Sequence, residues 1–239
     1  MLVKTKAIVL QTLKYNEKSL IVKCFTQTDG MKTYFVPSAY ASKKKQQKIA
    51  YFQPLNILEI EANHKNKGTL EHFKEIKLAL PFYTISSDVI KSTIILFLSE
   101  VLAAAIREEE QNEALFEFIE VAMEWLDTHE SVANFHLVFL VEITKYLGVF
   151  PDNSEDHFDF FDVKQGQFVS QQSLESLPAY ESLLFKNLLK LRFDSPKNIF
   201  NYQDRQVLLK VLLDYYAYHL DGFRRPKSLE VLKEVFEML

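Results

Sequence analysis

The hydrophobic pattern of this 239-residue chain changes its period once, just after Pro81. Before Pro81, short β-rich runs alternate apolar and polar residues, as half-buried strands do. After it, apolar residues recur every three to four positions over long segments, as amphipathic helices do. Strands at the start and helices afterwards predict the α+β class, with one domain at residues 1–77 and an all-helical domain at residues 78–239.

The N-terminal part predicts a small β-barrel. Asp29-Gly30 marks a hairpin turn, because this dipeptide readily supplies the positive φ that tight turns need. Closing the sheet would remove the exposed edges that short strands otherwise leave, and a five-stranded barrel of this size is the layout of an OB-fold. The expected strands lie at residues 7–10, 20–26, 33–36, 55–61 and 69–76.

The C-terminal part predicts a helical bundle with one excursion. Ser86 or Ser87 can cap the first helix, and Gly148 followed by Pro151 is a typical helix end. Residues 149–176 are polar and irregular, and a small β-hairpin is expected within them. The expected helices lie at residues 86–110, 113–127, 135–147, 180–191, 202–220 and 228–238.

Composition narrows the class of protein. With 48% hydrophobic and 25% charged residues the chain can bury an ordinary core, and no run reaches the roughly 18 apolar residues of a membrane span. Its first residues pass directly into a strand pattern and lack the features of a signal peptide. The single cysteine, Cys24, fits a reducing compartment and a buried strand position. We therefore expect a cytoplasmic protein with no membrane association.

Charge is divided by position along the chain. Residues 1–77 hold 14 Lys, no Arg and 6 acids, a net charge of +8, whereas residues 78–239 carry −12. Clustered lysines attract phosphates and release counterions on contact, which favours a polyanionic partner for the N-terminal part. A solvated lysine-rich surface without a partner explains the charge equally well.

The densest basic segment is a polar loop that predicts a DNA-binding site. Phosphate contacts need several cations on a flexible segment, and single-stranded bases need aromatic faces on which to stack. The alternative is a solvated loop whose flanking aromatic residues, Tyr51 and Phe52, lie in the core. The predicted DNA-binding residues are Lys43, Lys44, Lys45, Lys48 and Tyr40.

No catalytic or metal-binding motif is recognisable. The acidic stretch from Asp152 to Asp162 matches neither a calcium loop nor a zinc pattern, and it reads best as a solvent-facing loop. The chain also lacks a nucleophile elbow, a P-loop and a dinucleotide-binding glycine motif. We expect a protein that is not an enzyme and that has no metal and no cofactor.

A second basic cluster lies near the C-terminus, at Arg224, Arg225 and Lys227. Arginine grips carboxylates in a forked geometry, and the aromatic run at residues 215–219 is close in sequence. The cluster could therefore bind an acidic peptide that ends in an apolar residue. It could equally serve as a charge complement at a helix C-terminus.

Short segments spread over nearly the whole chain form a recognisable series by their order and spacing. They are residues 7–10, 15–19, Phe25, Thr26, Gly30, the loop at 42–48, Pro54, Leu70, residues 135–140 and 146–148, Pro151, and residues 226–228. Taken together, these segments resemble the RecO family of bacterial recombination mediators.

The resemblance implies an N-terminal OB-fold, a helical C-terminal domain and no bond-cleaving activity. Such proteins bind single- and double-stranded DNA and anneal complementary strands. With the partner RecR they help load the RecA recombinase onto DNA coated by single-strand-binding protein. Many members contact the acidic C-terminal tail of that coating protein, a role that would fall here to Arg224, Arg225 and Lys227.

The chain departs from the family pattern in two places. Many members carry a four-cysteine zinc site after the segment that ends here at Pro151, but no cysteine follows it, so no zinc site is expected. The family's Gly-Ala-Arg before the basic loop is replaced by Ser38-Ala39-Tyr40, and this replacement counts against direct DNA contact at Tyr40. Two other functions stay open, a protein-interaction adaptor that binds no DNA and a metal-dependent nuclease that uses the acidic loop.

Overall fold

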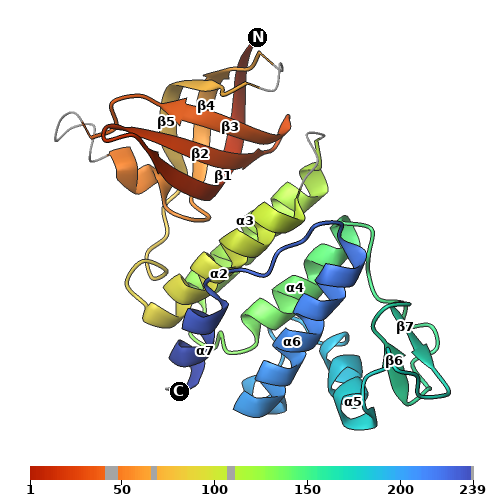
Figure 1. Cartoon of the computed structure of the whole chain (residues 1–239). Helices are drawn as coiled ribbons and strands as arrows, with labels where there is room; N and C mark the ends of the chain where they lie inside the picture. The colour runs from red at the N-terminus through yellow and green to blue at the C-terminus, as the bar shows by residue number, and fades with distance from the viewer. Residues whose placement is uncertain (41–47, 66–68, 107–110, 238–239) are drawn as a thin grey trace. The chain divides into compact units, whose positions relative to one another are not determined.

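The computed structural model describes the whole chain except residues 41–47, 66–68, 107–110 and 238–239, and it leaves the side chains of Lys48 and Lys197 undescribed. The described chain forms two compact units, Met1–Thr128 and His129–Leu239. Strands fill the first part of the first unit, and helices follow (Figure 1). The predicted α+β class is confirmed.

A five-stranded antiparallel sheet forms the N-terminal part of the first unit. Its strands lie in the order β3-β2-β1-β4-β5. The two outer strands also meet at one parallel bridge, between Tyr34 and Glu71. The sheet is therefore curved and OB-like, closed at that bridge and not along the full length of its edges. The strands are β1 (Leu2–Tyr15), β2 (Ser19–Thr26), β3 (Gly30–Val36), β4 (Ile57–Asn63) and β5 (His72–Leu80), with a short 3-10 helix, η1 (Lys48–Phe52), before β4.

β1 is much longer than the strand predicted at residues 7–10, because it pairs with two neighbours, whereas β4 and β5 begin two and three residues later than predicted. β1 pairs with β2 and β4, and its register with β2 shifts between Val9 and Gln11. Such a bulge inserts one extra residue and reverses which side chains face the core. Val9 is buried inside the sheet, and Cys24 is buried there as expected.

Helices α2 (Val89–Ala105) and α3 (Glu113–Thr128) belong to the same unit and cover part of the outer face of the sheet. The rings of Phe25 and Phe116 lie 5.9 Å apart, and the Lys6 ammonium is 2.7 Å from a carboxylate oxygen of Glu120. The N-cap of α2 is Asp88, whose carboxylate accepts two backbone N–H bonds. The prediction of Ser86 or Ser87 as the cap is thus wrong, because both serines lie in the turn before it.

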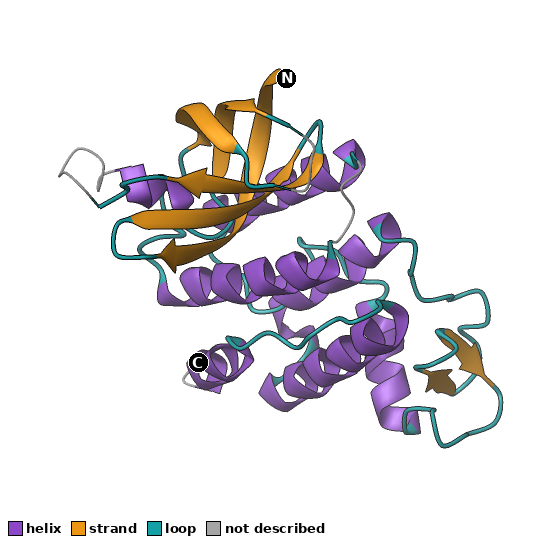
Figure 2. Cartoon of the chain, turned by 45° about the horizontal axis from the view of Figure 1, so that its top comes forward, coloured by secondary structure: helices purple, strands orange, loops and turns teal. Residues whose placement is uncertain are grey.

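The second unit is mainly helical and carries the small hairpin (Figure 2). The expected hairpin is formed by β6 (Phe160–Asp162) and β7 (Gln167–Val169), and it packs on α5 through the rings of Phe161 and Phe185, 4.5 Å apart. On α6, the Tyr216 hydroxyl donates to the carbonyl oxygen of Leu140 at 2.7 Å, which fixes α6 against α4. The helices are α4 (Phe135–Tyr146), α5 (Ala179–Leu188), α6 (Tyr202–His219) and α7 (Leu229–Glu237), with the 3-10 turn η2 (Lys197–Ile199).

The described helices are all too short or too polar to cross a lipid bilayer.

The last turn of α3 holds the segment that leads from β5 into α2. The carboxylate of Asp127 accepts backbone N–H bonds from Tyr83, Thr84 and Ile85 at 2.8–3.1 Å. The buried ammonium of Lys91 donates to the Thr84 hydroxyl at 2.7 Å and to the Asp127 carbonyl oxygen at 3.0 Å. Burial alone would raise the pKa of Asp127, but the donated bonds outweigh it and lower that pKa. This carboxylate therefore fixes the chain where strands give way to helices.

Replacing Asp127 should destabilise the first unit. The substitution Asp127→Ala leaves three backbone N–H groups without their acceptor, and we expect the free energy of unfolding to fall by roughly 3 kcal/mol. Urea unfolding followed by the fluorescence of Trp125, which lies on the same helix, measures the change. The control is Glu124→Ala, which removes an exposed carboxylate one turn earlier on α3 and should cost little. Equal stability of the two variants would contradict the role of Asp127.

A buried histidine makes the stability of the second unit depend on pH. His136 on α4 is 2% exposed, and its ring lies 5.0 Å from that of Phe236 on α7. Burial, helped by the nearby positive charge of Arg205, lowers the pKa of His136 from 6.5 to about 3. The folded protein therefore keeps the imidazole neutral, whereas the unfolded chain takes up a proton below pH 6.5. This contribution to stability is complete above pH 6.5 and is lost as the pH falls toward 3.

We expect His136 alone to lower the free energy of unfolding by about 2 kcal/mol between pH ~7.5 and ~5. His136→Gln cannot titrate in this range, so its stability should fall less over the same interval. Urea unfolding followed by circular dichroism at both pH values gives the comparison. His157→Gln removes an exposed histidine and should keep the pH dependence of the unsubstituted protein. An unchanged pH dependence in His136→Gln would refute this assignment.

Candidate nucleic-acid interface

The structure describes only part of the predicted DNA-binding site. Lys43, Lys44 and Lys45 lie outside the described residues, and Lys48 begins η1 with a side chain that is not described. Tyr40 is described and half-buried. Its backbone N–H donates to the carbonyl oxygen of Lys18 at 3.3 Å, and the ammonium of Lys14 lies 5.6 Å from the centre of its ring. Tyr40 is thus held beside the β1–β2 turn, between two lysines of the sheet.

The aromatic residues that follow the loop pack in or against the core of the sheet. Phe52 is 3% exposed and belongs to the core of the sheet, against which the half-buried Tyr51 also packs. The Thr12 hydroxyl donates to the carbonyl oxygen of Phe52 at 2.8 Å and fixes the end of η1 on β1. For Phe52, the alternative of a core position is confirmed.

A different set of rings lies on the outer face of the sheet. Tyr15 at the end of β1, Phe35 on β3 and His72 at the start of β5 form one row across three strands. The ring centres of Tyr15 and Phe35 are 6.0 Å apart and those of Phe35 and His72 are 5.9 Å apart, both edge to face. Tyr15 is 47% exposed, and Leu13, which lies on the same face, is 50% exposed. We call Tyr15, Phe35 and His72 the aromatic row.

Sequence reasoning missed the aromatic row because strand pairing creates it. Phe35 faces Ile21, and Ile21 faces Leu13, in the observed register. Strict alternation along β1 would place Tyr15 on the same side as the buried Val9, and the bulge at Val9–Gln11 reverses this. The one signal for Tyr15 in the sequence is its position next to a polar turn, which indicates exposure but not the neighbouring rings.

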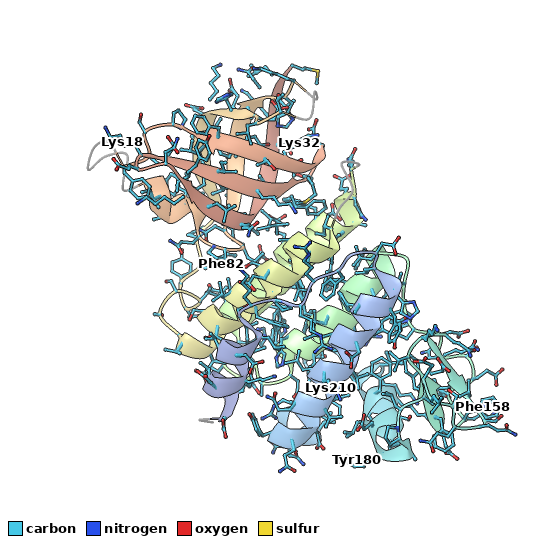
Figure 3. The ribbon with its side chains drawn as sticks, viewed as in Figure 1. Lys18, Lys32, Phe82, Phe158, Tyr180 and Lys210 are labelled. Atoms are coloured by element: carbon cyan, nitrogen blue, oxygen red, sulfur yellow. The ribbon has the colours of Figure 1, made fainter. Side chains whose placement is uncertain are left out.

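Lysines without acidic partners lie beside the aromatic row. Among the described residues, Lys14 and Lys18 form no ion pair. Figure 3 shows Lys18 at one end of the sheet and Lys32 at the other, so the two lysines do not belong to one cluster. Lys14 and Lys18 flank the β1–β2 turn, the loop that borders the binding face of OB-folds. The arrangement brings free positive charge and exposed aromatic rings to the same end of the sheet.

The other faces of the sheet are less suited to a polyanion. A hollow of about 380 Å³ over β1, β4 and β5 is lined by Lys4, Lys6 and Lys77 but also by Glu59, Glu61 and Glu75. Three cations are there balanced by three anions, so the hollow offers no net attraction to phosphate. Further along β2, the Lys23 ammonium donates to the carbonyl oxygen of Ala103 on α2 at 2.8 Å. Helices therefore occupy that part of the face, and the β1–β2 end remains open.

The acidic stretch in the second unit has a structural part. Asp162 is 2% exposed, and its carboxylate accepts the backbone N–H bonds of Lys164 and Gln165 at 3.1 and 2.8 Å, which shapes the turn between β6 and β7. The prediction of a fully solvent-facing loop is wrong at this residue. Asp156 forms an ion pair with Lys190 at 2.7 Å. Across the described residues, no three His, Cys, Asp or Glu side chains come together as metal ligands would.

The C-terminal basic cluster is exposed at Arg224, Arg225 and Lys227. Arg225 forms an ion pair with Asp214 on α6. The neighbouring Tyr215 and Tyr216 are buried, with their hydroxyls bonded to backbone carbonyl oxygens, so only Tyr218 of the three tyrosines is exposed. Peptide binding by Arg224, Arg225 and Lys227 stays a prediction.

Known proteins resemble the chain along its whole length. The family model described as "Recombination protein O N terminal" matches residues 1–82, and the one described as "Recombination protein O C terminal" matches residues 86–230. The chain is 60% identical over 237 residues to the DNA repair protein RecO of Flavobacterium psychrophilum and 58% identical over 236 residues to that of Flavobacterium johnsoniae. It is 31% identical over 245 residues to the RecO of Porphyromonas gingivalis. Each alignment covers 99% of this chain and 100% of the relative. The chain therefore belongs to the RecO family of DNA repair proteins.

Proposed function

We propose that this protein is a recombination mediator that binds and anneals single-stranded DNA. In this role it helps to load the RecA recombinase onto DNA coated by single-strand-binding protein. The single observation that carries the proposal is the aromatic row, which lies beside the unpaired Lys14 and Lys18 on an OB-like sheet. Membership of a family of DNA repair proteins supports it.

The chemistry of this surface suits binding without sequence selection. Lysines contact phosphates, which carry no sequence information, and aromatic rings stack on any base because every base has a π-face. Annealing brings two strands of like charge together, and a cationic surface screens their repulsion. Base-edge recognition is not needed for either step.

The proposal assigns DNA binding, to both single and double strands, to the sheet domain at residues 1–77 and protein contacts to the helical domain at residues 78–239. The loop residues Lys43, Lys44, Lys45 and Lys48 would extend the cationic surface, with Tyr40 at its edge. RecR is the expected partner, and Arg224, Arg225 and Lys227 would contact the acidic tail of single-strand-binding protein. The mediator acts by binding, without bond cleavage and without a cofactor, in the cytoplasm where the DNA lies.

Neutralising the unpaired lysines tests the DNA-binding surface. We expect Lys14→Gln combined with Lys18→Gln to flatten the slope of log affinity against log salt by about 1.5, because two phosphate contacts are lost. Fluorescence anisotropy with a labelled single-stranded oligonucleotide at several salt concentrations measures the slope. The control is Lys4→Gln combined with Lys77→Gln on the mixed-charge hollow, which removes the same charge and should leave the slope nearly unchanged. A protein that only connects other proteins would show no salt-sensitive binding in any variant.

The mediator role is tested on coated DNA. We expect Arg224→Ala combined with Lys227→Ala to lose the acceleration of annealing that depends on the acidic tail of single-strand-binding protein, while annealing of bare strands is kept. Strand annealing is measured on DNA coated with the intact and with the tail-deleted coating protein. Lys164→Ala combined with Lys210→Ala removes two exposed charges of the same unit and should anneal coated DNA normally. Equal annealing with and without the tail in the unsubstituted protein would remove these residues from the proposal.

A further inference from the structure

The sheet is left open between β3 and β5. Closure rests on two backbone bonds, from the Glu71 N–H to the Thr33 carbonyl oxygen at 2.8 Å and from the Phe35 N–H to the Glu71 carbonyl oxygen at 2.9 Å. The next N–H that β3 could donate in this parallel pattern belongs to residue 37, which is proline and has no N–H. Within the described chain, no second bridge joins these two strands. The strands therefore part beyond Phe35.

An apolar groove lies where the strands part. It encloses about 180 Å³, and its main lining residues are Phe35, Val36, Ile49, Phe52, Phe73 and Ile76, with Lys74 beside them. Phe73 is stacked on Tyr34 with ring centres 4.0 Å apart, and the planes of Phe52 and Phe73 are within 22° of parallel. The inner wall is thus already a stack of rings with a hollow beside it. We call this hollow the β3–β5 groove.

No acid is among the described lining residues of the groove, and a lysine without an acidic partner stands near it. Lys74 is the one charged residue among its described lining residues, and no acid lines it. Lys14 on β1 pairs with Leu20 on β2, and Leu20 pairs with Val36 on β3, which lines the groove. Two strand spacings therefore separate Lys14 from Val36, a distance of about 10 Å. Lys74 is paired with Glu61, whereas Lys14 lies over the Tyr40 ring and has no acidic partner among the described residues. A ligand that joins an apolar ring to an anionic backbone would match both features.

The size of the groove limits what it can hold. Pockets that enclose a drug-sized ligand measure about 300–1,000 Å³, and a helix with its side chains is about 10 Å across. A hollow of about 180 Å³ suits a single planar ring system instead. We propose that the β3–β5 groove receives one unstacked base of a bound single strand, with Lys14 facing a neighbouring phosphate. The inference rests on the proposed function and names a base-binding subsite within it, which adjoins the aromatic row at Phe35.

Filling the groove from either wall tests the inference. We expect Val36→Trp and, separately, Ile76→Trp to weaken binding of a base-bearing oligonucleotide by about 5- to 150-fold, the range for loss of one stacked base. Binding to an abasic oligonucleotide of the same length should not change in either variant, because its phosphates are still contacted. The salt dependence should also keep its slope. Fluorescence anisotropy with both oligonucleotides at two salt concentrations measures all three quantities.

The control is Leu2→Trp, which adds the same ring at an exposed site on β1 outside the groove. Circular dichroism and urea unfolding establish that each variant is folded. The two filling variants change different strands, so the test can still be made with one of them if the other does not fold. Unchanged affinity for the base-bearing strand in a folded filling variant overturns the inference, as does an equal loss on the abasic strand. Both of those results leave DNA binding itself intact. If the unsubstituted protein shows no salt-sensitive binding, the proposed function fails instead.

Discussion

The bridge between Tyr34 and Glu71 is the contact on which the shape of the sheet depends. Without it the edges of β3 and β5 would both be free, and the curl that strand twist and the β1 bulge give the sheet would not be closed. The bridge is held at a buried polar corner, where the Tyr34 hydroxyl lies 2.8 Å from Nε2 of His64 and the Glu71 carboxylate accepts the backbone N–H of Lys65 at 2.9 Å. The amino terminus of Met1 donates to the carbonyl oxygen of His64 at 2.6 Å and ties the start of β1 to the same corner. Since a buried polar group left without a partner is costly, these bonds hold the corner in one arrangement.

That closure has two consequences for the surface that is proposed to bind DNA. It brings β5 beside β3, so that His72 can extend the aromatic row from Phe35. It also ends at Pro37, which leaves the groove instead of a continuous ladder. One short bridge therefore produces both an outer row of rings and an opening toward the core.

Several elements could be predicted from sequence because their signals are local. Most helices begin and end within about three residues of the expected positions, whereas α2 ends at Ala105, well before the expected residue 110. Gly148 and Gly30 have the positive φ of 72° and 63° that their turns require. The hairpin in the second unit and the buried Cys24 also follow from local patterns. The α2 cap was misplaced by one or two residues because serine and aspartate are both good caps, and only the folded turn decides which side chain reaches the free N–H groups.

The candidate site was harder to predict because it depends on register. The bulge at Val9–Gln11 has no clear signature in a run of alternating residues, yet it decides that Tyr15 lies on the outer side of the sheet and that the exposed Lys14 lies on the same side as Leu20. Likewise, Asp162 reads as one more surface acid, and only the turn that it anchors explains its burial. Tyr215 and Tyr216 belong to an aromatic run that reads as a binding surface, but Tyr216 is buried against α4 and Tyr215 is buried beside Phe161 of the hairpin. Charge, by contrast, could be assigned to its half of the chain from composition alone.

In the proposed DNA-binding surface, positive charges and aromatic rings belong to different residues. Lysine contacts release counterions and therefore weaken as salt rises, whereas stacking on rings changes little with salt. In the proposed site the two contributions would come from different residues, Lys14 and Lys18 for the first and Tyr15 and Phe35 for the second. A strand held by both would be able to slide when one set of contacts is broken, because the other would still hold it. A protein that pairs two strands needs such a hold, since each base must leave the protein surface to meet its complement while the backbone stays bound.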